Sequence, residues 1–257
     1  MKEKIKAFLL GLGVDDVGIA SVRDYRSPRS PDIQSIFPGV RSIVVLAHKA
    51  LSNCESGNMQ IAMGGRLDEI EFARSTNYRL ARFLEKELKA KAMTVPPSYP
   101  LYMSDETKGT IGDVSLRHAA IAAGLGHLGR HNLVIHPRLG SRVLFTAVLT
   151  NLDLPSDPPV TETLCTGCHL CVTSCPVGAL DEEGKTDDMK CLKNSQPYGI
   201  GSAIRFWTKF AESPIEDQKR MIKDVHFWRL YQAGFIGFQY FCFNCFKSCP
   251  VGQNGET

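Results

Sequence analysis

Apolar and polar positions follow two different periods along the first 155 residues, one typical of helices and one of strands. The segments 16–22 and 41–48 predict strands, and the second one, RSIVVLAH, predicts a buried strand because it is an uninterrupted run of largely β-branched apolar residues. A loop over 51–66 is predicted to precede a long helix over 67–92. Residues 2–12 predict an amphipathic helix whose apolar face is Ile5, Phe8, Leu9 and Leu12.

Further along the chain, a helix is predicted over about 114–123, with Asp113 as its N-cap and Gly124 just past its end. Residues 132–154 predict two strands joined by a Pro/Gly turn. The proline-rich segment PSDPPVTE predicts a linker, so we expect one domain over 1–155 and a second over 156–257. Within the second domain a helix is expected to start with Ser213 as N-cap, Pro214 at the first position and Glu216 at the third.

Composition places the chain among ordinary globular proteins, with 43% hydrophobic residues and a net charge of +3 in 257 residues. No apolar run approaches the ~20 residues that a membrane helix needs, and the N-terminus has no signal-peptide cleavage site. We therefore expect a cytoplasmic protein with no membrane partner. Eight of the nine cysteines lie in the last hundred residues, which in a reducing compartment indicates metal binding rather than disulfides.

The strongest motif is a run of four cysteines ending in Cys175-Pro176, with the spacing C-x2-C-x2-C-x3-C-P of bacterial ferredoxins. In that run three cysteines hold one 4Fe–4S cluster and the fourth binds a second cluster. A second, shorter motif ends in Cys249-Pro250. A full copy of the first motif would need a cysteine at position 239, which is Gln239. Cys191 is the one cysteine of this domain outside both motifs, so it is predicted to supply the missing ligand. The predicted ligands are Cys165, Cys168, Cys171 and Cys249 for cluster one, and Cys175, Cys191, Cys242 and Cys245 for cluster two.

Two structural zinc sites are the alternative use of eight cysteines. Zinc does not require the Cys-Pro endings or the third closely spaced cysteine, so the pattern favours clusters. Cys54 stands apart and is predicted to be an ordinary buried or loop thiol. The aromatic residues around the second motif are expected either to pack as core or to exclude solvent from a cluster, and these are Phe241, Phe243 and Phe246.

The segment AGLGHLGRHN, residues 123–132, contains the spacing G-x-G-x-x-G. A dinucleotide fingerprint follows a strand and opens a helix, whereas this segment follows a predicted helix and precedes a predicted strand. We therefore reject a dinucleotide site. Gly124 is expected to end the helix, and Gly126 and Gly129 to let the backbone approach a large flat cofactor.

The segment AAGLGHLGRHNLVIHPRLGSRVLFTAVLTNLDLP, together with both cysteine motifs, resembles epoxyqueuosine reductase and, more remotely, the corrinoid reductive dehalogenases. The resemblance implies an α+β fold in which a flavin-reductase-like (nitroreductase-like) α/β domain binds cobalamin. It implies a following ferredoxin-like domain whose two 4Fe–4S clusters reduce that cofactor. His127 stands where the family usually has tryptophan. The residues expected to contact the corrinoid are Gly126, His127, Gly129, His131, Gly140 and Ser141.

The chain departs from the family at the position of its catalytic aspartate, which here holds Thr110. Asp113 is the best acid candidate, with an ordinary N-cap role paired to Arg117 as the alternative, and Tyr102 and Tyr78 are weaker proton donors. The family usually carries a C-terminal helical-repeat extension that helps to hold tRNA, and this sequence stops at Thr257. The cluster and corrinoid chemistry is therefore expected to carry over better than a tRNA substrate.

These observations predict an iron–sulfur oxidoreductase of the epoxyqueuosine-reductase-like type. An external low-potential donor, flavodoxin or ferredoxin, would supply electrons that pass through two 4Fe–4S clusters to a corrinoid, for a reductive step on a small molecule or modified nucleoside. Two other functions stay open: an electron-transfer protein that activates the cofactor of a partner, and a flavin-dependent reductase.

Overall fold

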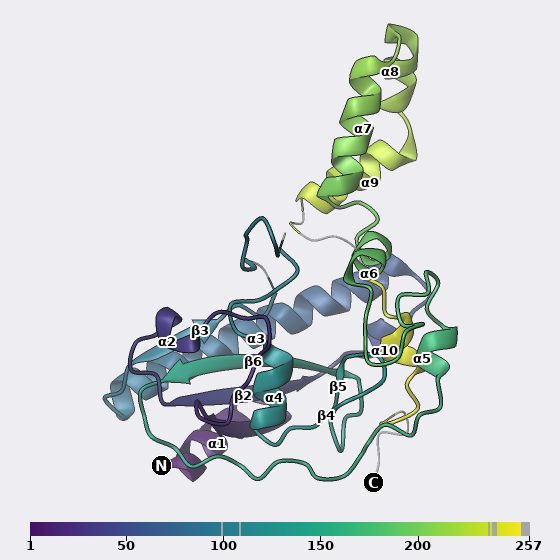
Figure 1. The fold of residues 1–257 in the computed structure, drawn as a ribbon. Coiled ribbons are helices and arrows are strands. Elements are labelled where there is room, and N and C mark those ends of the chain that lie inside the picture. Colours follow the sequence, from purple (N-terminus) through teal and green to yellow (C-terminus); the bar gives the residue numbers. More distant parts are fainter. Residues whose placement is uncertain (99, 108, 236, 238–240, 253–257) are drawn as a thin grey trace.

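The computed structural model describes residues 1–98, 100–107, 109–235, 237 and 241–252, and Gln239 lies outside the described residues. Its centre is a four-stranded antiparallel sheet with the order β1-β2-β6-β3 (Figure 1). The strand β2 pairs along its whole length with β6, so that Ser42 lies opposite Thr150 and Lys49 opposite Val143. The four strands are β1 (Asp16–Ser21), β2 (Ser42–Lys49), β3 (Ala92–Val95) and β6 (Val143–Thr150).

Helices cover both faces of this sheet. On one face α1 (Lys2–Gly11) and α3 (Met59–Glu87) pack against Val44 and Leu46 of β2. On the other face α2 (Ile33–Ile36) and α4 (Leu116–Ala122) pack against Ile43 and Val45. Because successive side chains of a strand point to opposite faces, a strand buried on both faces is apolar throughout. This explains the uninterrupted run in β2 and confirms the prediction of a buried strand.

The predicted start of the long helix is wrong. The segment 51–66 is not one loop, because it contains η1 (Ser52–Glu55) and the first turns of α3. Asn58 is the reason for the early start: its side-chain oxygen accepts hydrogen bonds from the backbone N–H groups of Gln60 at 2.9 Å and Ile61 at 3.2 Å. This is an N-cap, and it satisfies donors that the first turn of a helix leaves free.

The predicted N-cap of α4 is also wrong. The cap is Ser115, whose backbone N–H donates to the hydroxyl of Tyr25 at 2.8 Å, and Asp113 lies in the preceding loop. The predicted end of the helix is confirmed, because Gly124 follows it with φ +70°, in the left-handed region that favours glycine. Two short strands come next, β4 (His127–Leu128) and β5 (Val134–Ile135), which pair as a hairpin outside the main sheet. The predicted Pro/Gly turn joins β5 to β6, and it is closed by paired backbone bonds between His136 and Gly140.

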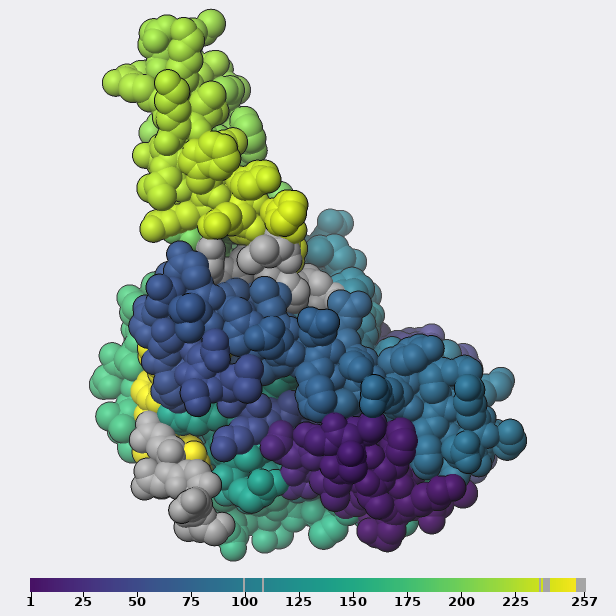
Figure 2. Space-filling view, turned by 180° about the vertical axis from the view of Figure 1, so that it is seen from behind, coloured from purple at the N-terminus to yellow at the C-terminus, as the bar shows by residue number. Residues whose placement is uncertain are grey.

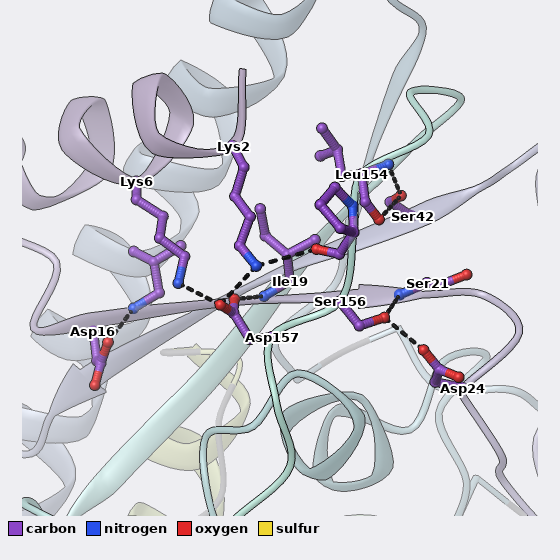
Figure 3. A network of polar contacts seen from close by, with 12 residues as sticks. Lys2, Lys6, Asp16, Ile19, Ser21, Asp24, Ser42, Leu154, Ser156 and Asp157 are labelled. Carbon is purple, nitrogen blue, oxygen red and sulfur yellow. Dashed lines mark hydrogen bonds and ion pairs between the residues drawn. The ribbon is translucent and has the colours of Figure 1, made fainter.

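The segment that follows β6 runs along the edge strand β1 (Figure 3). Asp157 accepts hydrogen bonds from Lys6 and from the backbone N–H of Ile19, both at 2.8 Å, and its N–H donates to the carbonyl of Ile19 at 2.8 Å. Lys2 pairs with the same carboxylate at 2.8 Å. The predicted linker therefore covers an otherwise open sheet edge and is held against the first half of the chain.

The second half of the chain is helical. The helices α7, α8 and α9 project from the body of the molecule, while α10 returns beside α5 (Figures 1 and 2). The predicted helix start near residue 213 is displaced, because Pro214 caps α8 and the hydroxyl of Ser213 bonds to the carbonyl of Lys209 in α7.

No helix in the described ranges is both long and apolar enough to span a membrane. The helices are α5 (Leu170–Thr173), α6 (Asp188–Ser195), α7 (Ile200–Glu212), α8 (Ile215–Met221), α9 (Val225–Phe235) and α10 (Asn244–Ser248).

Candidate iron–sulfur and cofactor site

The cysteines predicted for cluster one line a common cavity. Three of them come from the loop before α5 and from α5 itself, and Cys249 comes from the end of α10. The two helices are tied together by a hydrogen bond of 2.6 Å between the hydroxyls of Ser248 and Ser174. The chain thus brings Cys249 to the closely spaced cysteines Cys165, Cys168 and Cys171, although it lies far from them in the sequence.

The cysteines predicted for cluster two also lie close to one another. Burial raises the pKa of Cys245 to about 12, and the neighbouring thiols of Cys242 and Cys191 contribute to the increase. Burial likewise raises the pKa of Cys191, with further contributions from Cys242 and Cys175. Cys191, Cys242 and Cys245 line one cavity, and Cys175 is assigned to the same second group of thiols from the cysteine spacing. A bound cationic core would offset the repulsion between the thiolates.

The donor set fits iron–sulfur clusters. Within the described part of the chain, no three His, Cys, Asp or Glu side chains converge closely enough to hold a single metal ion. Four of the thiols line one cavity, and three of the remaining four predicted ligands line another. Cysteine thiolates are the usual ligands of 4Fe–4S clusters.

The β5–β6 turn anchors the C-terminal cysteine segment. The hydroxyl of Ser141 donates to the carbonyl of Phe246 at 2.7 Å, and the guanidinium of Arg142 donates to the carbonyl of Cys249 at 2.5 Å. Gly140 has φ +61°, and a Cβ there would overlap the carbonyl oxygen of Val251. Gly140 and Ser141 therefore contact the protein segment that carries Cys249. Ser141 also lines the cavity of about 450 Å³ described below, and the predicted contacts of both residues with a corrinoid stay predictions.

The glycines of the β4–β5 hairpin also face protein. A Cβ at Gly126 would overlap the carbonyl of Ile135, and one at Gly129 would lie 2.7 Å from the Cδ1 atom of Ile135. The close approach that these glycines allow is therefore between parts of the hairpin. His127 is exposed, and its Nδ1 atom lies 3.1 Å from the carbonyl of Leu128. The predicted contacts of these three residues with a corrinoid stay predictions.

The tip of the hairpin touches the first group of thiols. The backbone N–H of Arg130 donates to the Sγ atom of Cys165 at 3.4 Å. The next residue, His131, is only 5% exposed and lines the cavity of the first group. Burial lowers the pKa of His131 to about 4, and the positive charge of Arg142 lowers it further. The sequence pattern assigned His131 to a corrinoid and missed its place beside the cysteines.

A cavity of about 450 Å³ lies between the main sheet and the second group of thiols. Its walls are mostly apolar and come from α3, α4 and β6, with three cysteines on the opposite side. Mostly apolar cavities of a few hundred cubic ångströms are typical binding sites for small molecules and cofactors. Among the residues that line it are Leu116, Leu144, Phe145, Cys191, Cys242 and Cys245.

Two guanidinium groups are the charged features among the described residues that line this cavity. Arg66 forms an ion pair of 2.8 Å with Glu69 and lies 5.5 Å from the ring centroid of Phe243. Arg117 donates to the carbonyl of Asn132 at 2.7 Å. Both side chains line the cavity, and guanidinium groups suit the binding of phosphate or carboxylate. Arg66 was missed in the sequence, although a charged residue on the apolar stripe of a helix is a detectable signal.

Asp113 precedes α4 in the chain and is not among the described residues that line this cavity. Its expected partner Arg117 bonds to Asn132 instead. Tyr102 and Tyr78 are likewise outside the lining. The proposed proton donors therefore stay predictions.

Comparison with known proteins first defines the class of the site. The family model of the 4Fe-4S binding domain matches residues 158–181, the segment that carries the first cysteine motif. The second half of the chain thus contains a ferredoxin-type 4Fe–4S binding segment, and the α+β class predicted from the sequence is confirmed.

The particular relatives are epoxyqueuosine reductases. The chain is 28% identical over 218 residues to the enzyme of Bacillus cereus, which corresponds to 75% of this chain and 55% of the relative. It is 32% identical over 174 residues to that of Gloeobacter violaceus, or 66% of this chain and 51% of the relative. The predicted resemblance to epoxyqueuosine-reductase-like iron–sulfur proteins is thereby confirmed. The chain spans about half the length of the curated relatives it matches.

Solved structures share the fold. An epoxyqueuosine reductase bound to a tRNA-Tyr stem loop with the epoxyqueuosine modification superposes with a TM-score of 0.63 at 18% identity, covering 100% of this chain and 66% of that one. A reductive dehalogenase, whose structure suggests a mechanism for B12-dependent dehalogenation, superposes with a TM-score of 0.58 at 20% identity. That match covers 74% of this chain and 28% of the dehalogenase.

Proposed function

We propose that this protein is an iron–sulfur reductase that delivers low-potential electrons to a cofactor or substrate bound in the cavity of about 450 Å³. One observation carries this proposal: Cys191, Cys242 and Cys245, three of the four cysteines assigned to cluster two, form part of the cavity wall. A protein that only transfers electrons to another protein has no need of an internal cavity beside its second redox site.

The two groups of cysteines are proposed to hold two 4Fe–4S clusters. The first group would lie on the electron-entry side, because the loop 166–170 beside it is exposed and offers a surface to an external flavodoxin or ferredoxin. The second group would lie on the exit side, against the cavity. The aromatic rings of Phe243 and Phe246, which are both buried, exclude water from the space between the second group and Arg66.

The cofactor proposed for the cavity is a corrinoid, held by a nitroreductase-like domain over residues 1–155. Support comes from the B12-dependent chemistry named for the dehalogenase relative and from the mostly apolar lining of the space beside the thiols. When bound, the clusters would supply one-electron transfer and the corrinoid a strongly reducing metal centre. Arg66 and Arg117 would hold anionic groups of the cofactor or substrate at the rim of the apolar space.

Asp113 is proposed as the proton donor. It precedes α4, and Leu116 and Arg117 of that helix line the cavity. A carboxyl group placed beside a bound substrate can act as a general acid. The proposed substrate is a modified nucleoside or a related small molecule, because a solved relative holds a modified tRNA stem loop.

Anaerobic titration with cobalamin, followed by its visible spectrum, tests the cofactor proposal. We expect wild-type protein to bind cobalamin with one-to-one stoichiometry. Leu144→Trp should abolish binding, because the larger ring fills the cavity that Leu144 lines. Leu10→Trp is the matched control, since Leu10 is 51% exposed on α1, and it should bind normally.

Two results would redirect the functional assignment. A yellow protein with a flavin spectrum and no cobalamin binding would support a flavin-dependent reductase. Reduction of a partner protein without any small-molecule binding would support an electron-transfer role.

A further inference from the structure

One ring nitrogen of His131, a residue that lines the cavity of the first group of thiols, is buried without a partner in the described part of the protein. The side chain is 5% exposed and lines the cavity formed by Cys165, Cys168, Cys171 and Cys249. Its Nε2 atom is buried and has no hydrogen-bond partner among the described residues. A buried polar atom without a partner costs about 1–3 kcal/mol, so a native site normally supplies one.

The hydrogen bond at the other ring nitrogen, Nδ1, determines which nitrogen of His131 carries the proton. The backbone N–H of Leu133 donates to the Nδ1 atom of His131 at 3.1 Å. A backbone N–H can only donate, so Nδ1 must be the acceptor and carries no hydrogen. A neutral imidazole in this state has its proton on Nε2. The ring therefore presents an N–H donor to the cavity of the four thiols.

We propose that His131 donates a hydrogen bond from Nε2 to a sulfur of cluster one and thereby raises the reduction potential of that cluster. This inference rests on the iron–sulfur part of the proposed function. A reduced cluster carries one more negative charge than an oxidised one, and a donor aimed at its sulfur stabilises the more negative state. In this proposal His131 does not bind iron; it changes the reduction potential of a cluster that the cysteines hold.

The substitution His131→Asn keeps the hydrogen bond from the backbone of Leu133 and removes only the N–H donor at Nε2. In His131→Asn the side-chain oxygen can still accept from Leu133, because the Oδ1 of Asn and the Nδ1 of His are equally far from the backbone. The shorter side chain has no group at the position of Nε2. His131→Gln makes the opposite change, because its amide N–H can reach the cavity while the bond from Leu133 is lost.

His136→Asn is the matched control. His136 is 2% exposed, and its Nδ1 also accepts from the backbone two residues later, Arg138, at 3.2 Å. Its Nε2 atom already has a partner, the carboxylate of Asp16 at 3.1 Å. The two histidines therefore make the same local bond, but of the two, His131 lines the cavity of the four thiols and its Nε2 atom has no partner in the ranges that the structure describes.

Redox titration of the anaerobic proteins, followed by electron paramagnetic resonance, provides the readout. Wild type should give two separate reduction waves. In His131→Asn one wave should move to lower potential, with about a tenfold smaller ratio of reduced to oxidised cluster at a fixed potential, equivalent to about 59 mV for one electron. His131→Gln should shift that wave less, and His136→Asn should shift neither.

The outcomes separate this inference from the proposed function. If wild-type protein assembles no 4Fe–4S cluster, the proposed function and this inference both fail. If all variants keep their iron and His131→Asn leaves both waves unmoved, or moves them no more than His136→Asn does, the tuning role of His131 is wrong and the proposed function stands.

Discussion

The buried residue His48 belongs to a chain of hydrogen bonds that the sequence pattern did not predict. His48 on β2 is 2% exposed, and its Nε2 atom lies 3.1 Å from the hydroxyl of Thr146. That hydroxyl donates to the side-chain oxygen of Asn77 at 2.8 Å, so it accepts from His48, whose proton is on Nε2. Periodicity predicted a strand at His48, but the polar chain through Thr146 and Asn77 depends on strand register, which the sequence does not reveal.

His48 is expected to make stability depend on pH. Burial lowers its pKa to about 4, although Asp15 opposes the shift. An unfolded histidine takes up a proton near pH 6.5, so the stability present above that pH is lost as pH falls towards 4, at about 1.4 kcal/mol per unit. Between pH 7 and pH 5 the free energy of unfolding of wild type should therefore fall by about 2 kcal/mol more than that of His48→Gln. Urea unfolding at both pH values measures this, and parallel losses in the two proteins would contradict it.

At the scale of elements, sequence periodicity identified α1, β1, β2, α4 and β6, because each buries a regular face against the sheet. It misplaced the start of α3 because the cap at Asn58 is a local polar interaction without a periodic signal. It predicted cofactor contacts for Gly140 and Ser141 but not their contacts with protein. Those two residues contact α10 and the segment after it, more than a hundred positions away, and such a contact leaves no trace in local pattern.

The segment after β6 should stabilise the fold through Asp157. Burial alone would raise the pKa of this carboxyl, but hydrogen bonds from Lys2, Lys6 and the backbone of Ile19 outweigh burial and lower it. The stabilisation is therefore present above the ordinary pKa of aspartate and is lost as pH falls through the lowered folded value. Asp157→Asn should reduce the free energy of unfolding by about 2 kcal/mol at pH 7, and less in acid.

Asp153→Asn is the control for this prediction. The side chain of Asp153 is 76% exposed and lies 3.9 Å from Arg41, so its loss should cost well under 1 kcal/mol. Equal effects of the two substitutions in chemical denaturation at pH 7 would show that Asp157 does not anchor the segment.

The β5–β6 turn should control the docking of the segment that carries Cys249. A Cβ at Gly140 overlaps the carbonyl of Val251, so Gly140→Ala should separate the turn from residues 249–251. Hydrogen exchange of the amides of residues 246–251 should accelerate at least about tenfold, as expected for local opening. Gly39→Ala is the control, because Gly39 also has a positive φ, +83°, and has nothing within 4 Å of its Cβ position. Similar exchange in both variants would argue against the contact.

At the scale of the whole molecule, the two halves of the chain meet at the redox site. The hairpin tip contacts the first group of thiols, and the sheet, α3 and α4 enclose a cavity whose far wall is the second group. The cysteine spacing predicted the 4Fe–4S binding segment that the family model matches over 158–181, because a short loop around a cluster leaves a local signature. The cavity could not be predicted, because it lies between elements that are distant in sequence.

The iron content of anaerobically reconstituted protein tests the central claim most directly. Wild type and Cys54→Ser should hold about eight irons per chain, because Cys54 lies outside both groups of cysteines. Cys191→Ser should hold about four, since it removes a ligand of cluster two and leaves the first group intact. Unchanged iron in Cys191→Ser, or zinc in place of iron in wild type, would contradict the two-cluster account.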